Sequence, residues 1–268
     1  MNKAKLSHLL RQLNLIYLTD LVRFRVQKFK NRKANKAFKL QHPELKLPPD
    51  YLMYESFGIH YDNYYNGGLK MAQWLTNHFK NHIELEDKAV LDWGCGPGRI
   101  IRHLPTVIGH NCIFYGTDYN AASIAWCRSN LPNIQFNKND LTAHLPYENE
   151  TMDVIYGISI FTHLSEQMHY DWFKELHRVL KPNGIMLLSL QGDNYKAKLT
   201  STELTEFNAG KLVVRGKVKE GHRTYSAFHP KAFVEDLFKE VEILEHIVQT
   251  SSNKHWVPQD IWIIKKPQ

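Results

Sequence analysis

The chain has 268 residues, of which 43% are hydrophobic and 23% are charged, so it can bury one large core. No apolar run reaches the roughly 18 residues of a membrane-spanning helix, and charged residues interrupt the leucine-rich N-terminus where a secretion signal would be continuous. The three cysteines form no C-x-x-C pair. We therefore expect a cytoplasmic protein with no disulfide framework and no metal site.

Positive charge is concentrated at the N-terminus. Residues 1–40 contain eleven Lys or Arg and one acid, Asp20, which leaves a formal charge of −3 for the rest of a chain whose total is +7. Apolar residues at helical spacing predict a basic amphipathic helix over residues 4–30, followed by a polar stretch to Pro43. The helical positions are Leu6, Leu10, Leu13, Tyr17, Leu21 and Phe24. Residues 1–50 are thus predicted to form a helical arm and linker.

Two hypotheses remain open for this arm. A basic amphipathic helix binds anionic lipid, which would place residues 1–40 in peripheral contact with the inner face of a membrane. Alternatively, the helix docks on its own body or on a partner and its charges stay in solvent. Nucleic acid is not expected as a partner because no recognised binding fold is present. The sequence carries no signal for the oligomeric state.

Residues 51–268 form the predicted body, which begins with a tyrosine-rich stretch and a helix over about 67–80. The tyrosines at positions 54, 61, 64 and 65 either close over a ligand or serve in packing. Strands are predicted at 89–91, 112–116, 134–136, 154–158 and 185–190. Helices are predicted at 98–105, at 121–130 behind the cap Asn120, and after the cap Ser165. This alternation predicts an α/β fold, a parallel sheet covered by helices on both faces.

The alternation breaks after the fifth strand. Residues 196–228 contain a short helix over 202–207 and a hairpin that pairs 212–218 with 223–228. We interpret this segment as an insertion over the sheet edge where open α/β folds bind ligands, and therefore as a substrate cap. A helix at 230–239 and strands at 241–247 and 261–264 complete the body.

The first strand ends in the run Asp92-Trp93-Gly94-Cys95-Gly96-Pro97-Gly98-Arg99. A dinucleotide-binding turn, G-x-G-x-x-G, needs its third glycine where this chain has Arg99. A carboxylate at Asp92 would repel a diphosphate but would favour a ligand with an ammonium and a sulfonium group. The motif therefore favours a cationic ligand over a nicotinamide cofactor.

Two later strands also end in acids. Asp118 follows the second strand about twenty residues after the glycines, where an acid can accept hydrogen bonds from both ribose hydroxyls. Asp140 follows the third strand, where it can meet an exocyclic amine or serve as a turn residue.

Together these motifs resemble the class I S-adenosylmethionine (SAM)-dependent methyltransferases over about residues 85–192. Asp92 to Arg99 is similar to the family's first motif, Asp118 to its ribose acid and Asp140-Leu141 to its adenine contact. The resemblance implies SAM as cofactor and a Rossmann-like, seven-stranded, mostly parallel sheet whose last strand runs antiparallel. It implies these cofactor-binding residues: Asp92, Gly94, Cys95, Gly96, Gly98, Asp118, Tyr119, Asp140, Leu141, Ile158 and Ser159.

Transfer to a hydroxyl group also requires a base. His163, just past the fourth strand, is the first candidate, and His229 and Asp193 are others. Alternatively, His163 caps the next helix or packs on the cofactor. An Asn/Asp-Pro-Pro-aromatic motif, typical of family members that methylate amide or base nitrogens, is replaced here by Gly157-Ile158-Ser159-Ile160-Phe161.

The polar residues of the insertion suit a hydroxyl-rich acceptor: Asn208, Arg215, His222, Arg223 and Tyr225. The sequence thus favours O-methylation of a small molecule or glycan. The alternative is a non-catalytic SAM-binding subunit that supports a partner enzyme. An aminopropyl transferase is disfavoured because no acid-rich amine pocket follows the fourth strand.

Overall fold

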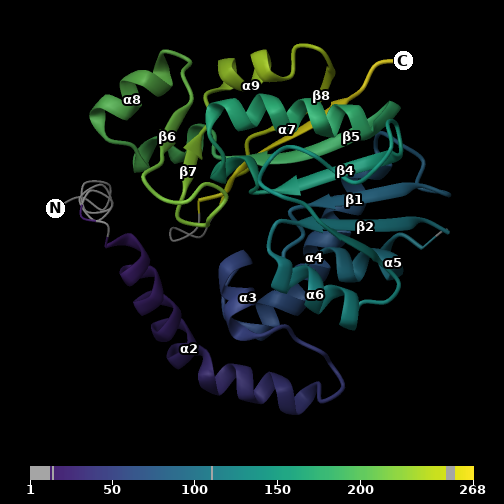
Figure 1. Ribbon diagram of the computed structural model, residues 1–268, viewed down its shortest axis with the longest axis vertical. Coiled ribbons are helices and arrows are strands. Elements are labelled where there is room, and N and C mark those ends of the chain that lie inside the picture. Colours follow the sequence, from purple (N-terminus) through teal and green to yellow (C-terminus); the bar gives the residue numbers. More distant parts are fainter. Residues whose placement is uncertain (1–12, 14, 110, 252–256) are drawn as a thin grey trace. The chain divides into compact units, whose positions relative to one another are not determined.

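A computed structural model describes residues 13, 15–109, 111–251 and 257–268 (Figure 1). Its main sheet is built from β1 (Ala89–Trp93), β2 (Ile113–Asp118), β3 (Gln135–Lys138), β4 (Met152–Ile158), β5 (Leu180–Leu190), β8 (Glu242–Ile247) and β9 (Asp260–Lys265). The strand order is β3-β2-β1-β4-β5-β9-β8. The chain divides into two compact units, residues 17–139 and residues 140–268, the second of which includes the described residues before Tyr17.

In the first unit, β2 pairs in parallel with both β1 and β3. Apolar β-branched and aromatic residues give these strands their buried positions, and Gly116 lies under the ring of Phe136, where a Cβ would come within 2.6 Å of the ring. Helix α6 (Ala121–Asn130) follows β2 and has the predicted cap, since the Asn120 side chain accepts from the amides of Ala122 and Ser123. The sequence therefore placed these elements correctly.

The predicted helix over 98–105 differs from the structure. A 3₁₀ turn spans Ile101–His103, and the short helix α5 spans Leu104–Val107. Gly98 has a φ of +78°, which extends the glycine-rich turn and delays the helix. Helix α4 (Tyr61–Lys80) begins six residues before its predicted start because the His60 side chain caps it by accepting from the amide of Asn63.

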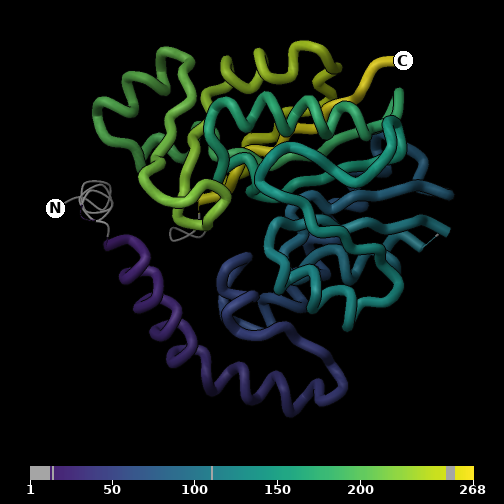
Figure 2. The backbone as a smooth tube through the Cα atoms, viewed as in Figure 1, coloured from purple at the N-terminus to yellow at the C-terminus, as the bar shows by residue number. Residues whose placement is uncertain are grey.

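The N-terminal arm contains one long helix, α2 (Ile16–Gln41), followed by the short helix α3 (Asp50–Ser56), which the sequence did not predict. Figure 2 follows this path from α2 through α3 into α4. The first part of the predicted helix, up to residue 12, lies outside the described residues. At the other end α2 continues through the predicted polar stretch, because Asn35 and Phe38 are buried on that part of the helix.

In the second unit, β4 and β5 are parallel, whereas β9 is antiparallel to both β5 and β8. This confirms the expected antiparallel last strand and the seven-stranded sheet. Helix α7 (Glu166–Val179) begins after Ser165, as predicted, and it buries His169, Trp172, Leu176 and Val179, while Met168 is half-buried.

The segment after β5 has a small core of its own. A 3₁₀ helix (Asp193–Lys198) leads to α8 (Ser201–Asn208), which begins with a capping box formed by Thr200 and Glu203. The predicted hairpin is present but shorter, with β6 (Val213–Arg215) paired to β7 (Ser226–Phe228). Helix α9 (Lys231–Leu237) then returns the chain to the main sheet. None of the described helices is long and apolar enough to cross a membrane.

Candidate cofactor site and acceptor-side residues

The glycine-rich turn after β1 uses the conformational freedom of its glycines. Gly94, Gly96 and Gly98 all have positive φ angles, of 78°, 52° and 78°. The turn directs its amides inward: the amides of Gly94 and Cys95 donate to the carbonyl oxygen of Thr117 at 2.8 and 2.9 Å. Because these donors are already engaged, they offer no cradle for a diphosphate, in agreement with the prediction of a cationic ligand.

Asp118 ties the end of β2 to this turn. One carboxylate oxygen accepts from the amide of Gly96 at 2.8 Å, and the other accepts from the amide of Asn120 at 2.7 Å. The pKa of Asp118 is raised to about 6. Burial is the main cause, the two amide hydrogen bonds act in the opposite direction, and the nearby charge of Glu55 adds to the rise. Each oxygen keeps a second lone pair, so the carboxylate can still accept from ribose hydroxyls.

The first unit holds three other predicted cofactor contacts, Asp92, Cys95 and Tyr119. Asp92 is buried at the end of β1, in register with Gly116 on β2. Burial raises the pKa of the Cys95 thiol, with the charges of Asp92 and Asp118 among the further causes, so this cysteine is a neutral packing group. Tyr119 is half-buried beside Asp118.

Helix α3 contributes residues that the sequence reasoning missed. Glu55 accepts from the side-chain amide of Asn120 at 2.9 Å. Ser56 lies against the turn, so that a Cβ added at Gly96 would come within 3.0 Å of the Cβ of Ser56. No motif in the sequence connects these two residues to glycines forty positions away, because the contact is made only by the folded arm.

The tyrosines at the start of the body support the packing hypothesis. Tyr54 donates to the carboxylate of Asp20 at 2.7 Å, and Tyr61 donates to Asp50 at 2.6 Å. Tyr64 is fully buried and donates to the carbonyl of Pro97 at 2.8 Å, where it fixes the glycine-rich turn from outside. These hydroxyl groups therefore already serve the fold.

The second unit holds the remaining predicted cofactor contacts. Asp140 is exposed, and the carbonyl of Leu141 accepts from the indole of Trp172 at 3.0 Å. Ile158, the last residue of β4, is half-buried. The role of each as a cofactor contact stays a prediction.

Among these residues, Ser159 has the most unusual backbone conformation. Its φ is +66°, a strained value for a residue with a side chain. A polar network holds it there: its amide donates to the hydroxyl of Ser189 at 2.7 Å, and its hydroxyl accepts from Gln259 at 2.6 Å. Ser189 in turn donates to Gln259 at 2.6 Å. Such enforced strain clusters at functional sites, which agrees with the predicted role.

His163 has the tautomer that a base requires. Its Nδ1 lies 2.8 Å from the carbonyl oxygen of Tyr225, and since a carbonyl can only accept, Nδ1 carries the proton. In the neutral ring Nε2 is then an unprotonated acceptor. Burial lowers the pKa of His163, followed by the smaller opposing effect of this hydrogen bond, so the ring is neutral near pH 7.

The other two candidate bases have different surroundings. His229 is buried, and its Nε2 lies 2.9 Å from Nε2 of His169, so one of the two rings donates to the other. Burial lowers the pKa of both histidines. Asp193 is exposed and forms an ion pair with Lys196 at 3.0 Å. Of the three candidates, His163 best fits a base, although all three roles remain predictions.

One polar residue of the insertion, Arg215, is engaged in contacts within the insertion itself. Arg215 forms two parallel hydrogen bonds with Glu203, at 2.8 and 2.7 Å, and donates to the carbonyl of Lys198. These bonds bring the pKa of Glu203 down to about 2 although burial alone would raise it. Arg215 therefore stabilises the insertion rather than offering its donors to an acceptor.

Comparison with known families identifies the central part of this chain. The model of a family described as "Methyltransferase domain" matches residues 90–184. Residues 90–184 thus form a methyltransferase domain. The glycine-rich turn, Asp118 and His163 all lie within the matched residues of this methyltransferase domain.

Curated methyltransferases are similar to about half of this chain. Phthiotriol/phenolphthiotriol dimycocerosates methyltransferase 1 of Mycobacterium ulcerans is 32% identical over 154 residues, which cover 53% of this chain and 54% of that protein. Trans-aconitate 2-methyltransferase of Escherichia coli is 31% identical over 118 residues, covering 42% and 43%. The chain thus spans about half the length of these relatives.

Solved structures share the fold of the methyltransferase domain. A SAM-dependent methyltransferase from Methanosarcina mazei has a TM-score of 0.57 and 19% identity, covering 71% of this chain and 97% of that one. A protein from Pyrococcus horikoshii has a TM-score of 0.55 and 19% identity, covering 77% and 96%. The predicted family, its Rossmann-like fold and its cofactor, SAM, are thereby confirmed for the domain.

Proposed function

We propose that this chain transfers a methyl group from SAM to a hydroxyl group of a small molecule or glycan. The observation that carries the choice of a hydroxyl acceptor is the state of His163. Its hydrogen bond to the Tyr225 carbonyl leaves Nε2 as the acceptor, and its lowered pKa keeps the ring neutral. A neutral imidazole with an accepting nitrogen is what removal of a hydroxyl proton requires.

The residues of the chain have separable roles in this proposal. SAM, when bound, supplies a methyl group already activated by the sulfonium. Asp92 offsets the positive charge of the ligand and Asp118 accepts its ribose hydroxyls, which fits the inward-facing amides and the buried carboxylates of the first unit. His163 takes the proton of the acceptor at Nε2, and the Tyr225 carbonyl stabilises the resulting imidazolium through Nδ1.

The names of the relatives support methyl transfer and leave the acceptor open. One acts on phthiotriol and phenolphthiotriol dimycocerosates, a second is a sterol 24-C-methyltransferase of Schizosaccharomyces pombe and a third is named for trans-aconitate. Because these acceptors differ, the choice of a hydroxyl group depends on His163.

The variant His163→Asn tests the proposal. The asparagine amide can still donate to the Tyr225 carbonyl, but no base remains, so we expect transfer to fall by about 10²- to 10⁴-fold while SAM binding, measured by titration calorimetry, is unchanged. His177→Asn, on α7, removes another half-buried histidine and should leave transfer unchanged. The acceptor is sought with methyl-labelled SAM and a panel of glycans, hydroxylated small molecules, proteins and nucleic acids.

Label found only in proteins or nucleic acids would contradict the proposed acceptor class. SAM binding without transfer to any acceptor would instead favour a non-catalytic subunit.

We also propose that the protein is cytoplasmic and that its basic N-terminal arm makes peripheral contact with the inner face of a membrane. Eight Lys or Arg against one acid in α2 support an anionic partner surface.

A further inference from the structure

Helix α2 leaves an apolar surface uncovered. Leu18, Val22 and Phe29 are 58%, 54% and 78% exposed. Their spacing places them on one face of the helix, and Arg25 falls on the same line. The cations Arg32 and Lys36 continue this line toward the C-terminal end of α2, so that one face is apolar first and basic afterwards.

The opposite face of α2 is fixed to the rest of the first unit. Asn31 donates to the carbonyl of Ile59 at 2.7 Å, and Asn35 accepts from the amide of Tyr61 at 3.0 Å. Phe24 meets the ring of Tyr54 edge-on at 5.3 Å. Because these contacts fix the rotation of the helix, the apolar and basic line is held outward rather than turned toward the core.

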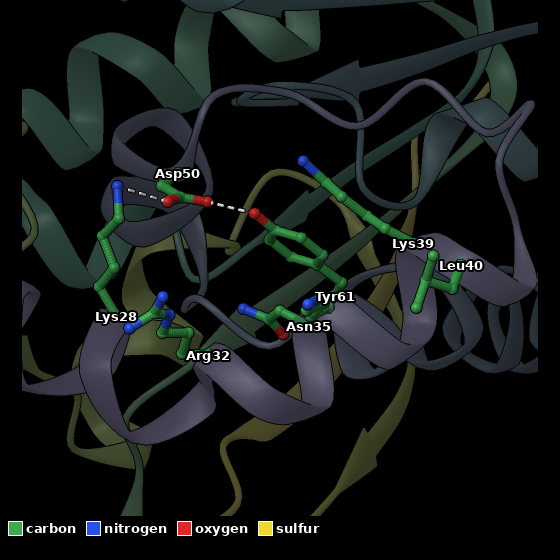
Figure 3. A pocket seen from close by; sticks show the side chains of 8 residues that line it. Lys28, Arg32, Asn35, Lys39, Leu40, Asp50 and Tyr61 are labelled. Carbon is green, nitrogen blue, oxygen red and sulfur yellow. Dashed lines mark hydrogen bonds and ion pairs between the residues drawn. The ribbon is translucent and has the colours of Figure 1, made fainter.

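A pocket of about 310 Å³ opens beside this line (Figure 3). Four of the residues that line it are cations, and one is an acid, Asp50. The complete lining is Lys28, Arg32, Asn35, Lys36, Lys39, Leu40, Asp50 and Tyr61.

The internal contacts of the pocket neutralise only part of its charge. Lys28 and Asp50 form an ion pair at 3.0 Å, and Tyr61 donates to the other oxygen of Asp50, as the two dashed lines in Figure 3 show. The Nζ atom of Lys39 lies over the Tyr61 ring, 5.2 Å from its centre. Arg32 and Lys36 have no acidic partner among the described residues. The pocket therefore carries a net positive charge that suits a phosphate group.

We propose that α2 binds the surface of an anionic membrane, with a phospholipid phosphate in this pocket and with Leu18, Val22 and Phe29 inserted among the acyl chains. This deepens the peripheral contact proposed above by naming the ligand group and the residues that bind it. Exposed apolar side chains beside the cations favour a lipid over nucleic acid or a free phosphate, neither of which would cover them.

Vesicle flotation of the full chain tests this inference. Wild-type protein should float with vesicles of phosphatidylglycerol and phosphatidylcholine but not with phosphatidylcholine alone. Arg32→Gln with Lys36→Gln should weaken binding about 25-fold, since each lost charge corresponds to about fivefold. Phe29→Ser should weaken it about tenfold by removing an inserted ring.

The matched control is Arg23→Gln with Lys30→Gln, which removes two exposed charges of the same helix away from this line. If the control weakens binding as much as the pocket variant, the attraction is diffuse and the pocket has no role. Binding of glycerol phosphate or of single-stranded RNA by a wild-type protein that ignores anionic vesicles would overturn the lipid assignment. All variants should bind SAM normally, so a failure of membrane binding is distinguishable from a failure of methyl transfer.

Discussion

Cofactor binding should depend on pH through Asp118. Burial raises the pKa of this carboxyl to about 6, against the opposing effect of two amide hydrogen bonds. Ribose hydroxyls donate to the carboxylate, so the ligand binds the ionised form and the apparent dissociation constant grows by a factor of 1 + 10^(pKa − pH). At pH 5 binding should therefore be about 11-fold weaker than above pH 7, or about 1.4 kcal/mol.

Titration calorimetry with the demethylated product of SAM between pH 5.0 and 7.5 measures this dependence. Asp118→Asn should bind weakly and with little change over the same range. Asp171→Asn, which removes an exposed carboxylate on α7, should keep the wild-type slope. A flat wild-type profile would refute the assignment of Asp118 as a ribose ligand that titrates near pH 6.

Three further predictions concern stability. Burial lowers the pKa of His169 from 6.5 to about 4, so the neutral ring contributes fully to the free energy of unfolding above pH 6.5, and about 3 kcal/mol of that contribution is lost as the pH falls to 4. Thermal melts of His169→Asn should therefore show a weaker loss of stability in acid than those of the wild type. Gly68→Ala places a Cβ 2.2 Å from the carbonyl oxygen of Arg99 and should cost about 1–3 kcal/mol in urea unfolding, whereas Gly67→Ala meets no atom within 4 Å and should stabilise α4 by about 0.5–1 kcal/mol. Asn183 has a φ of +64°, so Asn183→Ala should lower the melting temperature and Asn183→Gly should not.

The strands and the glycine-rich turn were predictable because local sequence determines them. The run at 154–158 and, apart from Ser189, the run at 185–190 carry no polar side chain except the Tyr156 hydroxyl, as buried parallel strands require, and they lie within β4 and β5. The three glycines between Asp92 and Arg99 are enough to predict a turn at this place, because glycine readily adopts positive φ angles. In contrast, the start of the next helix depends on the positive φ of Gly98, which the sequence permits but does not demand.

The candidate base shows what a sequence can and cannot determine. The position of His163 after β4 was enough to nominate it, but the choice between a base and a cap depends on its ring nitrogens. That choice is made by the carbonyl of Tyr225, 62 residues further along the chain, which fixes the proton on Nδ1. Because the donor–acceptor pair forms only when the insertion folds back, no local pattern around His163 carries the information.

The arm shows the same limit on a larger scale. Its asparagines look like solvent-facing residues in the sequence, and the apolar residues look like the buried side of an amphipathic helix. The structure assigns them differently: Asn31 and Asn35 satisfy backbone groups of Ile59 and Tyr61, while Phe29 remains exposed. The face of α2 that docks therefore combines these asparagines with the rings of Phe24 and Phe38, because buried backbone groups of the neighbouring segment need hydrogen-bond partners as well as apolar contacts. The line of Leu18, Val22 and Phe29 is left for a second surface.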